Sequence, residues 1–111
     1  MKITNKISLD EIRMLAEESF GDFAKAVVDI ERGVISIGGE LHSDEESMLL
    51  DDGSRQEDLW GINIYPGLPE DKRVEFDSMI NIRPKQNNRS RGVDSPEIRE
   101  RILLILKNIV D

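Results

Sequence analysis

A run of basic residues lies between positions 83 and 91, in the string RPKQNNRSR, which contains four bases and no acid. This string leads to a helix start at Ser95. Guanidinium groups, amides, a hydroxyl group and helix N–H groups are the donors that recognise phosphate and carboxylate. The segment therefore predicts an anion site that uses Arg83, Arg89 and Arg91. The structural alternative is a solvated loop, or one paired with the acidic segment 40–58.

His42 is the only histidine, and it has Glu40 two residues before it and Asp44 two residues after it. In an extended segment this spacing places the three side chains on one side, where they could bind a metal ion or transfer protons. A single histidine provides fewer imidazole ligands than a typical catalytic zinc site, which usually has two or three. We therefore expect no metal site, while acid–base chemistry by Glu40, His42 or Asp77 stays an alternative. The structural alternative is a polar residue at the end of a strand.

Polar residues that disfavour strands occur inside the segment 59–83, where the pattern otherwise predicts strands. Such local inconsistency marks either a functional position or an internal hydrogen-bond network. We expect these residues to share one sheet face, with Arg83 at its end. The predicted ligand-binding residues are Arg83, Arg89, Arg91, Asn63, Asp77, Asn81 and His42.

Three helices are expected to position these groups. The string SLDE (8–11) is a capping box, and it begins an amphipathic helix that Gly21 ends. Ser43 is expected to cap a short acidic helix that runs to about Asp51, with Gly53 after it. Ser95 and Pro96 begin a helix that continues to the C-terminus. Its apolar stripe consists of Ile98, Ile102, Ile105, Leu106 and Ile109.

Two hairpins and a weak N-terminal strand at 3–7 complete the predicted elements. The first hairpin covers 24–41 and turns at Arg32 and Gly33, and the second joins 59–65 to 74–83. A two-residue first loop would pair Ile30 with Ile35, Val28 with Ile37 and Ala26 with Gly39. In the second hairpin we expect Trp60 opposite Ile80, Ile62 opposite Ser78, Ile64 opposite Phe76 and Asn63 opposite Asp77.

The order of elements predicts a single α+β domain over residues 1–111. Its core would be an antiparallel sheet of two hairpins, with amphipathic helices packed on one face. Trp60 and the stripe of the last helix are expected in the core. The pattern leaves open whether the two hairpins are neighbours.

Composition narrows the class of protein. The 111 residues include no cysteine, which excludes disulfides, thiolate metal sites and a cysteine nucleophile. A net charge of −8 opposes general nucleic-acid binding. No apolar run reaches the length of a signal peptide or the ~18 residues of a membrane span, so we expect a cytoplasmic protein without a membrane partner. Phosphate-loop, dinucleotide-binding, zinc-protease and calcium-loop motifs are absent.

Four strings carry a resemblance to a known family: GGELHSDEE (38–46), GSRQEDLWGINIYP (53–66), FDSMINIRP (76–84) and NRSRGV (88–93). They resemble those of a family of short prokaryotic proteins catalogued as a domain of unknown function, along most of the chain. The resemblance implies a free-standing, prokaryotic and cytoplasmic protein. It implies no activity, cofactor or catalytic residue.

The sequence therefore predicts a small-ligand or anion-binding domain, without a cofactor, whose Arg-rich loop lies beside a polar sheet face. A protein–protein interaction module is the alternative from a different class. In it, the acidic segment 40–58 would contact the basic loop 83–91 of a second copy or of another partner. The third alternative is a small enzyme that uses His42, Glu40 or Asp77 as acid or base.

Overall fold

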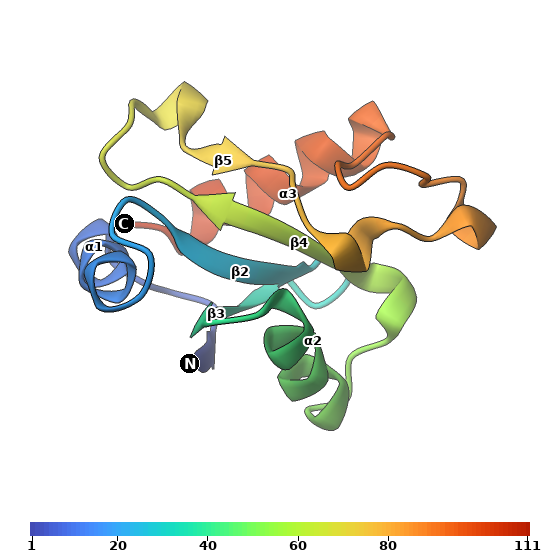
Figure 1. Cartoon of the computed structure of the whole chain (residues 1–111), viewed down its shortest axis with the longest axis horizontal. Coiled ribbons are helices and arrows are strands. Elements are labelled where there is room, and N and C mark those ends of the chain that lie inside the picture. Colours follow the sequence, from blue (N-terminus) through green and yellow to red (C-terminus); the bar gives the residue numbers. More distant parts are fainter.

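Three α-helices and five β-strands form the regular part of the computed structural model, which describes residues 1–111. They are β1 (Lys2–Thr4), α1 (Leu9–Glu18), β2 (Ala24–Asp29), β3 (Val34–Gly39), α2 (His42–Asp51), β4 (Leu59–Ile64), β5 (Val74–Glu75) and α3 (Pro96–Ile109). Four 3₁₀ turns are η1 (Gln56–Asp58), η2 (Glu70–Lys72), η3 (Met79–Asn81) and η4 (Pro84–Gln86). The sheet is antiparallel with the order β1-β3-β2-β4-β5, so the predicted α+β class is confirmed and the two hairpins adjoin along β2 and β4 (Figure 1).

Helices cover both faces of the sheet. The main core lies between one face and the helices α1 and α3, and Trp60 and Ile102 are buried in it as predicted. On the other face, Leu49 of α2 packs on Val27 and Leu59. Figure 1 shows α2 on the near side of the sheet and α3 behind it. The amphipathic helices α1 and α3 therefore share one face, as expected, and α2 covers part of the face that we expected to be polar.

The starts of α1 and α3 agree with the sequence pattern. Ser8 Oγ accepts a hydrogen bond from Glu11 N at 3.1 Å, and Ser95 Oγ accepts one from Ile98 N at 3.3 Å. The predicted cap of α2 is wrong, because Leu41 and not Ser43 is its N-cap. Leu41 keeps extended backbone angles, and its carbonyl already accepts from Asp44 N and Glu45 N. No side chain caps α2.

The register predicted for the first hairpin is wrong by two residues. Asp29 pairs with Val34 and Val28 with Ile35, so the loop has four residues. The carboxylate of Asp29 accepts hydrogen bonds from Glu31 N and Arg32 N, both at 2.9 Å, and thereby stabilises the longer turn. Because the shift is two residues, Ala26, Val28, Ile35 and Ile37 keep their predicted face. A bulge between Lys25 and Ala26 moves Gly39 to the opposite face, where it pairs with Lys25 and lies against Glu45.

The second hairpin also differs from the prediction, because β5 ends at Glu75 and Asn63 lies opposite Glu75 instead of Asp77. Beyond that point the side chain of Asn81 replaces a strand partner. Its Oδ1 accepts from Gly61 N at 2.8 Å and its Nδ2 donates to Gly61 O at 2.9 Å. A Cβ atom at Gly61 would lie 2.5 Å from Ser78 Cβ, so only glycine fits beneath this segment.

Candidate functional site

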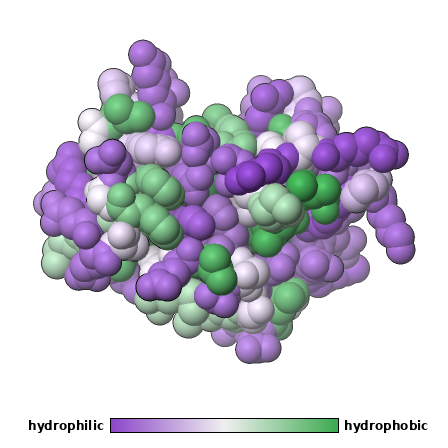
Figure 2. All heavy atoms as spheres, viewed as in Figure 1, coloured by the Kyte–Doolittle hydropathy of each residue, from purple (hydrophilic) through white to green (hydrophobic).

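A polar pocket of about 360 Å³ lies where the start of α2 meets β4 and the segment that follows β5. Its polar lining residues are Lys25, His42, Ser43, Asn63, Glu75, Asp77, Ser78 and Arg91. The structure thus brings together four of the residues that the sequence predicted for a site: His42, Asn63, Asp77 and Arg91. Figure 2 shows a mostly hydrophilic surface on this side of the molecule, with hydrophobic side chains in separate patches.

Arg91 and Asp77 form an ion pair in the wall of the pocket. Arg91 Nε donates to Asp77 Oδ1 at 2.7 Å, and the two side chains are 58% and 41% exposed. The backbone carbonyl of Arg91 accepts from Ser78 N at 2.9 Å and from Asn81 Nδ2 at 3.0 Å, which fixes the position of the residue. The two terminal guanidinium nitrogens have no partner within the chain and can bind an anion.

His42 enters the pocket from the first turn of α2 and is only 9% exposed. Its Nε2 lies 2.8 Å from the carbonyl oxygen of Ile62. Because a carbonyl only accepts, this nitrogen carries the proton and Nδ1 keeps a lone pair. Burial lowers the pKa of His42 below its ordinary value, although the bond to Ile62 raises it in part. The imidazole is therefore neutral at pH 7, and Nδ1 is an acceptor or a base.

Asn63 has one polar atom without a partner. Its Nδ2 donates to Glu75 Oε1 at 2.8 Å, which fixes the orientation of the amide. Its Oδ1 is buried and has no hydrogen-bond partner, and the residue as a whole is 7% exposed. A buried acceptor that lacks a donor costs about 1–3 kcal/mol, and it calls for an explanation such as a bound molecule.

Positive potential in the pocket comes from three sources. Lys25 of β2 and Arg91 carry formal charge. The first turn of α2, with Leu41, His42 and Ser43, contributes the positive end of the helix dipole, and no side chain caps it. The carboxylates of Glu75 and Asp77 balance the two formal charges, so the end of the α2 dipole is the remaining source of positive potential. The lining thus offers both donors and acceptors of hydrogen bonds to a polar molecule.

The other three predicted site residues lie outside the pocket lining. Arg83 donates to the backbone carbonyls of Leu59, at 2.6 Å, and Gln56, and its guanidinium stacks 4.2 Å from the centre of the Trp60 ring. Asn81 pairs with Gly61 as described above. Arg89 is exposed, and its backbone N–H donates to Asp94 Oδ2 at 3.0 Å.

The basic loop is held together from inside by Asn88, which is buried. Its Nδ2 donates to Asn81 O at 2.7 Å and to Gly92 O at 2.8 Å, and its Oδ1 accepts from Asp94 N at 2.8 Å. Hydrogen bonds from the Ser90 hydroxyl and the Arg89 N–H lower the pKa of Asp94. The loop is therefore an ordered scaffold that carries Arg91 to the pocket.

The sequence reasoning missed Lys25, Ser43, Glu75 and Ser78. Lys25 lies two residues before Val27, so strict alternation along β2 would have placed it on this face. Glu75 was missed because the predicted register put Asp77 opposite Asn63.

The trio around His42 is not assembled in the structure. Glu40 and Asp44 are exposed and do not line the pocket, so of the predicted acid–base residues only His42 and Asp77 meet there. No group of three or more His, Asp or Glu side chains is arranged to hold a metal ion.

Comparison with known proteins assigns the chain to a family. Residues 1–109 match the family described as protein of unknown function (DUF5674), and the chain belongs to that family. No curated protein and no solved structure matches it. None of its helices combines the length and the hydropathy that crossing a membrane requires.

Proposed function

We propose that the chain is a small-ligand-binding domain, that its site is the polar pocket at the start of α2, and that its ligand carries an anionic group. One observation carries the proposal. Polar groups from five separate segments converge on a pocket of ligand size, and three of these groups leave atoms without partners. These atoms are the terminal nitrogens of Arg91, Nδ1 of His42 and Oδ1 of Asn63.

The unpaired atoms define the chemistry of the ligand. The Arg91 guanidinium, held in place by Asp77, offers a two-pronged donor to a carboxylate or phosphate, with Lys25 and the first turn of α2 adding positive potential. His42 Nδ1 can accept a hydrogen bond, so the ligand also presents an N–H or O–H group. A small organic phosphate or carboxylate that bears a hydroxyl or amine meets both requirements.

The two alternatives from the sequence fit the contacts less well. The acidic segment 40–58 and the basic loop contact each other within one chain, since Arg83 donates to Gln56 O and Gln86 Nε2 donates to Glu57 O at 3.0 Å. These hydrogen bonds go to backbone carbonyls of the acidic segment, so the two segments already contact each other within one chain. Acid–base catalysis in the same pocket would depend on His42, because Glu40 lies outside it. The prokaryotic and cytoplasmic setting implied by the sequence resemblance stays a prediction.

The proposal is tested by a thermal-shift screen followed by calorimetric titration. The screen uses inorganic phosphate, nucleotides, phosphosugars, amino acids and short oligonucleotides. A ligand at a hundred times its Kd stabilises the native state by about 2.7 kcal/mol, which gives a clear rise in Tm. We expect a small phosphate or carboxylate compound to give that rise, and oligonucleotides to give none.

The best compound is then titrated into wild type, Arg91→Ala and Arg89→Ala. The two variants lose the same charge two positions apart, but only Arg91 lines the pocket. Loss of charge-assisted hydrogen bonds is expected to weaken binding by Arg91→Ala about tenfold or more, while Arg89→Ala binds like wild type. Equal binding by Arg91→Ala and wild type, or an equal loss in both variants, would show that the site lies elsewhere.

A further inference from the structure

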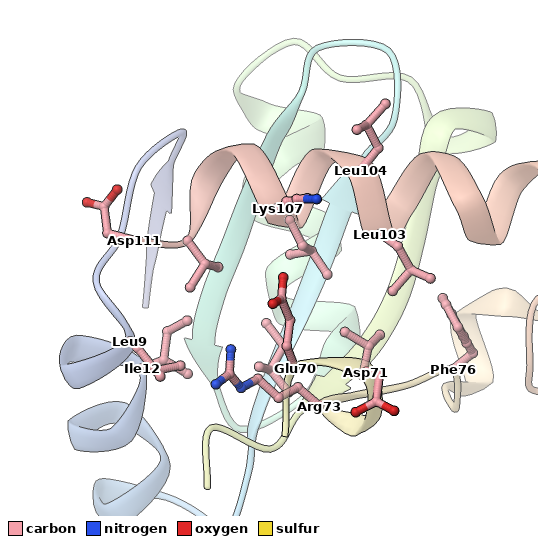
Figure 3. Close-up of a pocket in the computed structure, with 14 residues that line it drawn as sticks. Leu9, Ile12, Glu70, Asp71, Arg73, Phe76, Leu103, Leu104, Lys107 and Asp111 are labelled. Carbon is pink, nitrogen blue, oxygen red and sulfur yellow. The ribbon is translucent and has the colours of Figure 1, made fainter. Parts of the chain in front are cut away.

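An apolar groove of about 690 Å³ lies on the opposite side of the sheet from the polar pocket, between α3 and the segment that holds η2 and β5. Figure 3 shows α3 as one wall with Leu103 and Lys107, the segment with Glu70 and Arg73 as the facing wall, and Phe76 at one end. Nine of its fourteen lining residues are hydrophobic. The strand β5 at this edge of the sheet has only two residues, and the groove lies between its segment and α3.

Two leucines of α3 face outward beside this groove. Leu103 is 44% exposed and Leu104 is 59% exposed, whereas Ile102 and Leu106 on the inner side of the helix are buried. Both exposed leucines line the groove. Apolar side chains that gather at a concave surface mark an interaction site more often than singly scattered ones do.

One pair of opposite charges on α3 is placed symmetrically about these leucines. Glu100 lies three residues before Leu103, and Lys107 lies three residues after Leu104. Consider a second α3 that packs antiparallel, with a twofold axis between Leu103 and Leu104. Leu103 then contacts the partner's Leu104, and Glu100 contacts the partner's Lys107. The symmetry makes each of these contacts occur twice. A parallel arrangement would place like charges together. Antiparallel packing also sets the positive end of each helix dipole beside the negative end of the other.

We infer that this face binds a second copy of the chain, through antiparallel packing of α3 on α3 about a twofold axis between Leu103 and Leu104. Each copy then covers the mouth of the other's groove. The surface is separate from the polar pocket, so dimerisation and ligand binding are independent. The helix is roughly 21 Å long, which suits a contact between two whole helices.

The experiment is sedimentation equilibrium of the full chain over a range of concentrations, with circular dichroism to confirm that each variant is folded. Wild type is expected to approach twice the monomer mass of 12.7 kDa. Leu104→Glu places a carboxylate at the centre of the contact and is expected to sediment as a monomer. Leu50→Glu is the matched control, because Leu50 is an exposed leucine on α2.

Charge reversal tests the antiparallel register. Glu100→Lys and Lys107→Glu are each expected to weaken association about tenfold, because two attractive contacts become repulsive. The double variant restores opposite charges and is expected to return close to the wild-type Kd. Arg101→Glu is the control on the same helix, since Arg101 pairs with Glu31 of its own chain at 3.5 Å.

Three results would overturn the inference. A wild-type chain that stays at the monomer mass up to about 100 µM has no such interface of useful strength. A Leu104→Glu variant that still forms the dimer locates the interface elsewhere. If each single charge variant weakens association and the double variant does not recover it, the antiparallel register is excluded.

Discussion

Replacing Glu45 with glutamine should stabilise the protein at neutral pH. Glu45 lies in α2 and is fully buried. Its Oε2 accepts a hydrogen bond from Gly39 N at 3.0 Å, while Oε1 has no partner. Burial raises the pKa of Glu45 from its ordinary value of 4.5 to about 9, against the smaller opposing effect of the Gly39 hydrogen bond. The carboxyl is therefore neutral in the folded protein at pH 7 and ionised in the unfolded chain.

The magnitude follows from the difference in protonation between the two states. Between pH 4.5 and about 9 the folded state holds a proton that the unfolded state has lost, so the free energy of unfolding falls as the pH rises. The slope is about 1.4 kcal/mol per pH unit, and at pH 7 the accumulated loss is about 3 kcal/mol. Glutamine keeps the shape and the acceptor for Gly39 N without titrating. Glu45→Gln should thus gain about 3 kcal/mol at pH 7 and almost nothing at pH 4.

The assay is urea denaturation of wild type and Glu45→Gln at half-unit steps from pH 4 to pH 9. Only the difference between the two curves matters, because the other titrating groups are common to both proteins. Glu40→Gln is the control, since Glu40 is exposed and its replacement should change stability by no more than about ±0.5 kcal/mol at any pH. A difference that does not vary with pH would refute the argument that Glu45 is buried in its neutral form.

Two further predictions concern packing and backbone hydrogen bonding. Ile102→Ala should lower the free energy of unfolding by about 2–5 kcal/mol, because Ile102 is completely buried under the sheet; an unchanged urea midpoint would contradict its place in the core. Asn81→Ala should cost about 2 kcal/mol or more, because Gly61 N–H and C=O then lose their partners inside the protein. The exposed Asn108→Ala is its control in the same denaturation series, and equal effects would contradict the role given to Asn81.

The elements that could be predicted from the sequence are those decided by local chemistry. Ser8 and Ser95 cap their helices because each side chain reaches an N–H three residues away. The faces of β2 and β3 were also predictable, since alternation holds even where the register does not. Local rules were not always enough, since Ser43 was expected to cap α2 and Leu41 is its N-cap instead.

The register of both hairpins depended on hydrogen bonds from side chains to the backbone, which the predicted pairings did not include. In the first hairpin the carboxylate of Asp29 extends the turn, and it also accepts from Ser54 Oγ at 2.6 Å, 25 residues away in the chain. In the second, Asn81 reaches back across 20 residues to Gly61 and ends the pairing early. Sequence spacing gives no measure of such long-range contacts.

Prediction from the sequence was limited in the same way for the basic loop 83–91. Arg83, Arg89 and Arg91 have the same side chain and lie in the same basic run, so only their positions in the fold distinguish them. Arg83 lies against Trp60 and donates to carbonyls of residues more than 20 positions earlier, Arg89 is exposed, and Arg91 reaches Asp77. A charge run therefore predicts that guanidinium groups are available, but the loop that Asn88 holds together decides which of them reaches the pocket.

Three asparagines, Asn63, Asn81 and Asn88, differ in how their side-chain amides are hydrogen-bonded. The side-chain amides of Asn81 and Asn88 form hydrogen bonds with backbone groups that no strand pairs with. The fold itself therefore explains why asparagine, a poor strand former, occurs at these positions. Asn63 lies in a regular strand, and its Oδ1 is buried without a donor. What distinguishes Asn63 from the other two asparagines is therefore its unpaired acceptor and its place in the pocket lining, and the residue type alone predicts neither of these.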